Sequence, residues 1–128
     1  MNAKPEIRRL PESELDIMLA VWDGGEEGVT APEIGDVLAR PLTASALHSY
    51  LKRLEEKGFL SCAKLGKVNR YTALMSKEDY QAREGKSVLD KLYSSSLKRF
   101  TAALYDGGAL SRADLDELRE FLDDLAQK

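Results

Sequence analysis

The side chains with the clearest capacity for chemistry are hydroxyl, imidazole and cationic groups that recur at helical spacing between residues 43 and 74. A helix over residues 44–57 has one apolar face, which carries Leu47, Leu51 and Leu54. Its opposite face is small, polar and basic, and it carries Ser45, His48, Ser49 and Lys52. Small residues let a helix approach DNA closely, and hydroxyl and imidazole groups can bond base edges or phosphates. The pattern favours a helix that contacts the major groove.

Both ends of this helix suit the same role. Thr43 precedes the helix as a capping residue, and the N-terminal end of a helix directs free N–H donors toward a phosphate. Near the other end, Lys52 and Arg53 suit phosphates or guanine. The predicted DNA-contacting residues here are Thr43, Ser45, His48, Ser49, Lys52 and Arg53. The alternative is an ordinary amphipathic helix with a solvated polar face, and Glu56, which projects near the same side, supports that alternative.

A basic hairpin is predicted directly after the helix. Residues 59–63 and 68–73 have the pattern of two short strands joined by a glycine turn. This hairpin, residues 59–74, is the predicted wing. Its cations are expected to contact phosphates or the minor groove, and they are Lys64, Lys67 and Arg70. The alternative is a hairpin that its charges merely keep soluble. Leu65 beside the turn is expected to pack against the protein rather than to contact DNA.

Two further helices are predicted before the recognition helix. The first opens after Pro11, and its apolar residues at helical spacing are Leu15, Met18, Leu19 and Trp22. The second starts at Thr30, which forms a capping box with Glu33, and it ends before Pro41. Its predicted buried face consists of Ile34, Val37 and Leu38. Three helices followed by a hairpin are the order of a winged helix-turn-helix.

The rest of the chain is predicted to form three amphipathic helices, with interruptions at residues 94–96 and 106–108. Their apolar residues are Tyr80, Leu89, Leu92, Leu97, Phe100, Leu104, Leu115, Leu118, Phe121, Leu122 and Leu125. Helices this short do not easily enclose a core alone, so we expect a second copy of the chain to cover these stripes. The alternative is a small intramolecular cap over the winged domain.

The predicted fold is mainly α with a small β-hairpin. It comprises a winged helix-turn-helix domain over residues 1–75 and a helical dimerisation region over residues 76–128, with residues 1–10 as a loose arm. The net charge of −3 argues against nucleic acid, but the distribution matters more than the sum. Between residues 40 and 74 the only acids are Glu55 and Glu56. The cations there are Arg40, Lys52, Arg53, Lys57, Lys64, Lys67 and Arg70.

Other function classes lack the residues that they need. His48 and Cys62 are the only histidine and cysteine, so we expect no metal site and no internal disulfide. The sequence has no Gly-rich phosphate loop and no nucleophile elbow, so we expect neither an enzyme nor a bound cofactor. It has no long apolar run and no apolar signal core, and we therefore expect a cytoplasmic protein without membrane contacts.

The ordered series of segments resembles the penicillinase-repressor (BlaI/MecI-type) family of winged-helix transcriptional regulators, from Leu10 to Leu125. LPESELDIMLAVWD and TAPEIGDVL are similar to the family's first two helices, and LKRLEEKGFL is similar to the end of its recognition helix. The hairpin ending at Tyr71 is similar to the family's wing. SVLDKLYSSSL and LSRADLDELREFLDDL are similar to its dimer-forming tail.

The resemblance implies a bacterial homodimeric repressor that binds a palindromic operator. In the family, the residues that face the DNA match Ser45, Ala46, His48, Ser49 and Arg53 of this sequence. Ala46 replaces a usual hydroxyl residue, so we do not expect it to donate a hydrogen bond. Some members are cleaved between an asparagine and a phenylalanine, and Ala103-Leu104 stands at that place here, which argues against the same release mechanism. The copper-responsive branch has a cysteine-rich tail that this sequence lacks, so copper sensing is not expected either.

The alternative function is a winged-helix module that binds proteins without specific DNA binding. The cationic segment of residues 40–74 favours DNA over that alternative, because a purely protein-binding wing has less need of it. The sequence identifies no inducing protease or ligand.

Overall fold

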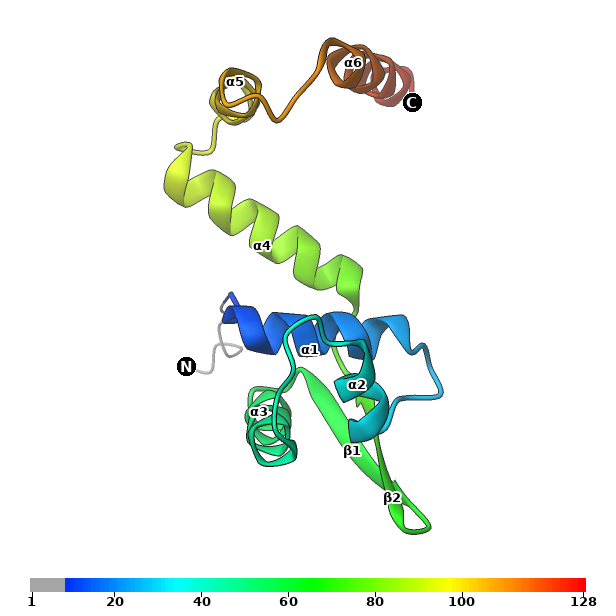
Figure 1. Ribbon diagram of the computed structural model, residues 1–128. Coiled ribbons are helices and arrows are strands. Elements are labelled where there is room, and N and C mark those ends of the chain that lie inside the picture. The colour runs from blue at the N-terminus through cyan, green and yellow to red at the C-terminus, as the bar shows by residue number, and fades with distance from the viewer. Residues whose placement is uncertain (1–8) are drawn as a thin grey trace, which may run out of the picture. The chain divides into compact units, whose positions relative to one another are not determined.

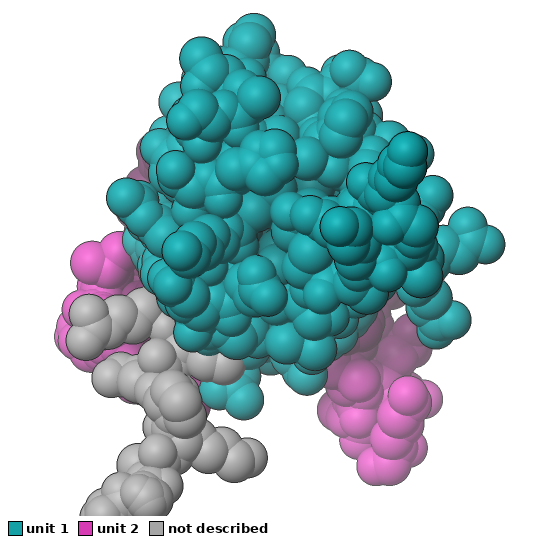
Figure 2. Space-filling view, turned by 90° about the horizontal axis from the view of Figure 1, so that it is seen from below, with its two compact units in different colours: residues 1–84 teal, residues 85–128 magenta. Residues whose placement is uncertain are grey.

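The computed structural model describes residues 9–128, and the expected arm of residues 1–10 falls almost entirely outside this range (Figure 1). The chain divides into two compact units, one ending at Glu84 and one comprising Gly85–Lys128 (Figure 2). The elements in order are α1 (Glu12–Asp23), α2 (Ala31–Val37), α3 (Ala44–Glu56), β1 (Leu60–Leu65), β2 (Val68–Ala73), α4 (Lys77–Leu92), α5 (Leu97–Asp106) and α6 (Arg112–Ala126). This confirms the mainly helical fold with one hairpin.

Local capping residues set where α2 and α3 begin. The Thr30 hydroxyl accepts a hydrogen bond from Glu33 N–H, and Glu33 Oε1 accepts one from Thr30 N–H at 2.9 Å, which completes the predicted capping box. These hydrogen bonds from Thr30 hold the pKa of Glu33 below its ordinary value. The Thr43 hydroxyl accepts from Ala46 N–H at 3.1 Å and caps α3 in the same way.

The core of the first unit lies where α1, α2, α3 and the hairpin meet (Figure 1). Its largest fully buried side chains are Ile17, Met18, Val21, Ile34, Leu51, Leu54 and Leu60. Two predicted core residues are instead exposed, Leu19 at 41% and Val37 at 68%. Leu19 is about 100° around α1 from Met18, and the stripe that faces the core is formed by Ile17, Met18 and Val21. Val37 is the last residue of the short helix α2, which buries Ala31 and Ile34.

The hairpin is a two-stranded antiparallel sheet whose register pairs Leu60 with Ala73 and Leu65 with Val68. Its first strand is shifted relative to the prediction, because Phe59 lies buried before it and accepts hydrogen bonds from the chain that leaves β2. Val29 adds an isolated bridge by exchanging two backbone hydrogen bonds with Tyr71, at 2.7 and 3.0 Å. The base of the wing is therefore tied to the loop before α2.

Tyr80 belongs to the core of the first unit, which corrects its assignment to a dimer surface. Its side chain is 4% exposed, and its ring lies 5.6 Å from that of Trp22 and 5.9 Å from that of Phe59. Its hydroxyl accepts a hydrogen bond from Leu10 N–H at 3.0 Å. The start of α4 is thereby packed into the first unit, and the division between units falls after Glu84 rather than after residue 75.

The second unit contains the end of α4 together with α5 and α6. Ser96 and Ser111 cap α5 and α6 through hydrogen bonds from Arg99 N–H and Asp114 N–H, both at 3.1 Å. Neither α5 nor α6, both of which the structure describes in full, contains a buried residue. The large apolar side chains exposed on the two helices are Leu97, Tyr105, Leu118, Phe121, Leu122 and Leu125. Large apolar side chains of this unit are therefore exposed on both α5 and α6.

Candidate nucleic-acid interface

One face of α3 presents the predicted polar residues to solvent. Ser45, His48 and Ser49 are exposed, and so are Thr43, Lys52 and Arg53. The opposite face is buried, because Leu47, Leu51 and Leu54 pack into the core of the first unit. The core therefore fixes the rotation of α3 about its axis and directs the polar face outward. The contact of these residues with DNA stays a prediction.

Two cationic positions on α3 differ in their surroundings. The Arg53 guanidinium lies 5.7 Å from the centre of the Tyr50 ring, a distance that suits a cation–π interaction. Tyr50 is itself half-buried against the core, so its ring restricts the positions open to Arg53. Lys52 is exposed, and the structure records no ion pair for it within residues 9–128. Arg53 is thus partly oriented by the Tyr50 ring, whereas Lys52 is an exposed cation near the same face with no ion pair recorded among the described residues.

His48 makes a contact that the sequence analysis missed. Its ring nitrogen Nδ1 lies 2.8 Å from the carbonyl oxygen of Ala44, one helical turn earlier. The sequence could have indicated this contact, because a polar side chain in a helix can reach the backbone carbonyl oxygen four residues earlier. The imidazole is held by this hydrogen bond while it remains exposed.

The three predicted cations of the wing differ in their exposure and in their hydrogen bonds. Lys64 and Lys67 are exposed near the turn between β1 and β2, which extends beyond the helices (Figure 1). Arg70 is half-buried, and its Nη1 donates a hydrogen bond to the carbonyl oxygen of Gly28 at 3.3 Å. Leu65 is 60% exposed, so the expectation that it packs against the protein was wrong. Lys64 and Lys67 carry the free positive charge of the wing.

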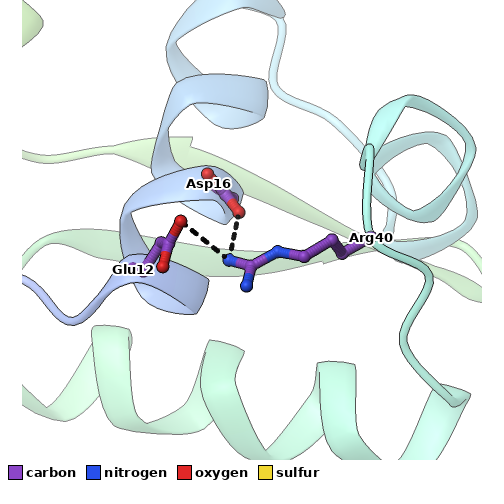
Figure 3. Close-up of polar contacts among 3 residues, drawn as sticks. All are labelled: Glu12, Asp16 and Arg40. Atoms are coloured by element: carbon purple, nitrogen blue, oxygen red, sulfur yellow. Dashed lines mark hydrogen bonds and ion pairs between the residues drawn. The ribbon is translucent and has the colours of Figure 1, made fainter.

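Arg40 does not add free charge to this surface. Its guanidinium pairs with Glu12 at 3.3 Å and with Asp16 at 3.2 Å, both on α1 (Figure 3). The hydrogen bond to the Asp16 carboxylate is the main cause that raises the pKa of Arg40. Arg40 therefore connects the segment before α3 to α1, although the sequence placed it in the cationic block.

The side chains that could ligate a metal are dispersed over the described part of the chain. Within residues 9–128, histidine, cysteine and carboxylate side chains do not gather in any group of three that could hold a metal ion. None of the helices in that range is both long enough and apolar enough to cross a membrane. Cys62 is half-buried and unpaired in β1.

Three helices followed by an antiparallel hairpin give the first unit the arrangement of a winged helix-turn-helix. The family described as penicillinase repressor matches residues 10–124, so the chain belongs to that family. It is accordingly a DNA-binding transcriptional repressor of the winged-helix type and not an enzyme.

Known relatives match over nearly the full length. The chain is 24% identical to the penicillinase repressor of Staphylococcus aureus, over 91% of this chain and 92% of that protein. It is 26% identical to the penicillinase repressor of Bacillus licheniformis, over 93% of each. A solved structure of the Bacillus licheniformis BlaI monomeric form in complex with the blaP half-operator shares 26% identity over 59% of this chain and 92% of that one, with a TM-score of 0.48.

Proposed function

We propose that the protein represses transcription as a homodimer that binds a palindromic operator through α3 and the wing. The observation that carries this proposal is the two-sided character of α3. Ser45, His48 and Ser49 are exposed on one face, while the apolar residues of the other face are buried in the core. A rigid helix with small polar residues outward can enter the major groove and contact base edges.

Free cations on both sides of this helix support the same function. Lys52 on α3 and Lys64 and Lys67 on the wing are exposed. Neutralised phosphates contribute much of the affinity of DNA-binding proteins and make that affinity depend steeply on salt. The residues outside segment 40–74 carry the excess of acidic side chains that makes the net charge negative.

The uncovered apolar faces of α5 and α6 support a dimer. Phe121 is 55% exposed and Leu122 52% exposed, and Leu118 and Leu125 share their side of α6. Covering these faces with a second copy would remove apolar area from water. In a two-fold dimer, the recognition helices would contact half-sites about 10 base pairs apart. We further propose that the protein acts in the cytoplasm, where its DNA lies.

Selection of bound sequences from a random DNA pool tests the proposal, with oligomeric state measured by analytical ultracentrifugation on the same protein. We expect a two-fold symmetric consensus and a dimer. An unsymmetric pool with no enriched sequence would overturn specific DNA binding and would favour the protein-interaction alternative.

A matched pair of α6 variants tests the dimer separately. Leu122→Glu places a carboxylate in the apolar face, and Ala113→Glu places one on the opposite side of the same helix. We expect Leu122→Glu to sediment as a monomer. It should bind the two-fold operator roughly tenfold more weakly or worse, because a monomer contacts one half-site at a time and loses the gain from linked binding. Ala113→Glu should remain a dimer. Monomers in both variants, or in neither, would contradict an interface at this face.

A further inference from the structure

The hydrogen bond between His48 and Ala44 determines which nitrogen of the imidazole carries a hydrogen. Nδ1 lies 2.8 Å from the Ala44 carbonyl oxygen, and a carbonyl oxygen can only accept. Nδ1 must therefore be the donor. In the neutral ring, a hydrogen on Nδ1 leaves Nε2 with a lone pair and no hydrogen.

Nε2 is the atom of this side chain that remains open to a ligand. His48 is exposed, and the structure records no hydrogen bond to Nε2 within residues 9–128. Ser45 and Ser49 are exposed beside it on the polar face of α3. Their hydroxyls can donate or accept by rotation, so they are adaptable, whereas the neutral imidazole offers an acceptor only.

The major groove presents few groups that suit an acceptor. Guanine N7 and O6, adenine N7 and thymine O4 are themselves acceptors, and only cytosine N4 and adenine N6 carry donor amino groups there. A phosphate oxygen is also an acceptor, so the neutral Nε2 does not suit the DNA backbone. The chemistry of the open nitrogen therefore selects an exocyclic amine.

We infer that His48 determines specificity at one base pair of each half-site by accepting a hydrogen bond at Nε2 from the amino group of cytosine or adenine. The Ala44 carbonyl orients the ring for this contact. The inference rests on the proposed function, because it requires α3 to lie in the major groove.

Two substitutions at His48 separate the orienting bond from the base contact. His48→Asn can keep a donor to Ala44 O, because its Nδ2 takes the place of Nδ1, but it has no atom at the place of Nε2. His48→Gln extends to that place and can form the bidentate amide pair with adenine. Selection from the random pool should give one preferred base pair at a defined position of each half-site for the unaltered protein. That preference should be absent for His48→Asn and should become adenine for His48→Gln.

Removal of the single amino group provides the second measurement. Purine in place of adenine, or 2-pyrimidinone in place of cytosine, deletes the donor at the selected position. We expect the unaltered protein to lose about five- to tenfold in affinity and His48→Asn to lose nothing. Nitrogen-15 spectra of the imidazole should show the hydrogen on Nδ1 in the free protein.

The outcomes distinguish this inference from the proposed function. If the pool yields no consensus with any variant, the proposed function fails. If a two-fold consensus appears and His48→Asn selects the same bases at every position, the function stands and the inference about His48 is overturned. Unchanged affinity of the unaltered protein for DNA that lacks the amino group, or a hydrogen found on Nε2 and not on Nδ1, would overturn it as well.

Discussion

Glu14 on α1 accepts a hydrogen bond from Lys57 at the end of α3, with Oε1 and Nζ 2.6 Å apart. The Glu14 side chain is 3% exposed and that of Lys57 is 44% exposed. A buried carboxylate is costly unless it is paired and hydrogen-bonded. Lys57 thus compensates a buried charge and holds the end of the recognition helix against α1, although the sequence analysis listed it only as one cation of the segment 40–74.

Replacing Lys57 with methionine should lower the free energy of unfolding by about 2 kcal/mol, because it leaves Glu14 buried without its partner. Urea denaturation measures the change. Lys52→Met is the control, since it removes an exposed cation from the same helix, and we expect less than about 0.5 kcal/mol there. The double variant Glu14→Gln with Lys57→Met should recover part of the loss. Equal destabilisation by Lys57→Met and Lys52→Met would contradict a structural role for Lys57.

Replacing Tyr80 with phenylalanine should destabilise the first unit by about 1 kcal/mol, because it removes the acceptor of Leu10 N–H while it keeps the ring. Thermal or urea unfolding followed by tryptophan fluorescence is a suitable measurement, since Trp22 lies beside Tyr80. Tyr105→Phe is the matched control on the exposed surface of α5. A Tyr80 variant as stable as the control would show that the hydroxyl contributes nothing.

The burial of Tyr80 also predicts that the stability of the protein depends on pH in the alkaline range. Desolvation by burial raises the pKa of Tyr80 above its ordinary value of 10.0. A raised pKa in the folded state means that Tyr80 contributes stability that is fully present below pH 10.0 and is lost as the pH rises through the folded-state value. The stability difference between the unaltered protein and Tyr80→Phe should therefore shrink over the range above about pH 10. A constant difference over that range would contradict the prediction.

Lys67 and Arg40 should affect DNA binding differently. Lys67→Gln should weaken binding to operator and random DNA alike and reduce the slope of log affinity against log salt by about 1. Arg40→Gln should change that slope much less, because its guanidinium already pairs with Glu12 and Asp16. Fluorescence anisotropy over a series of salt concentrations measures both. The same change in slope for the two variants would mean that the ion pairs open when DNA binds.

Ser49→Ala should act on sequence preference rather than on general affinity. Its hydroxyl lies on the exposed face of α3 and can bond a base edge. Its removal should therefore lower the ratio of operator affinity to random-DNA affinity by about fivefold. Competition binding with the two DNAs measures this ratio. Arg53→Gln should behave in the same direction. If Ser49→Ala, Arg53→Gln and Lys67→Gln all lose affinity equally on both DNAs, the division between base and phosphate contacts is wrong.

The amino-acid sequence by itself predicted the elements and the polar face of α3. Capping pairs such as Thr30 with Glu33 act over three residues, and the buried leucines of α3 recur at helical spacing. Patterns of this kind depend on the local chain, so the sequence shows them directly. The start of α3, the hairpin and the exposure of Ser45, His48 and Ser49 could therefore be predicted.

Only the tertiary structure decided which charges stay free and where the first unit ends. Glu14 and Lys57 are 43 positions apart, Gly28 and Arg70 are 42 apart, and Leu10 and Tyr80 are 70 apart. No periodicity connects such positions, because their contacts arise when α1, the wing and α4 pack around one core. Lys57 and Tyr80 looked locally like a surface cation and part of an apolar stripe, and long-range packing turned them into a partner for a buried carboxylate and a core residue.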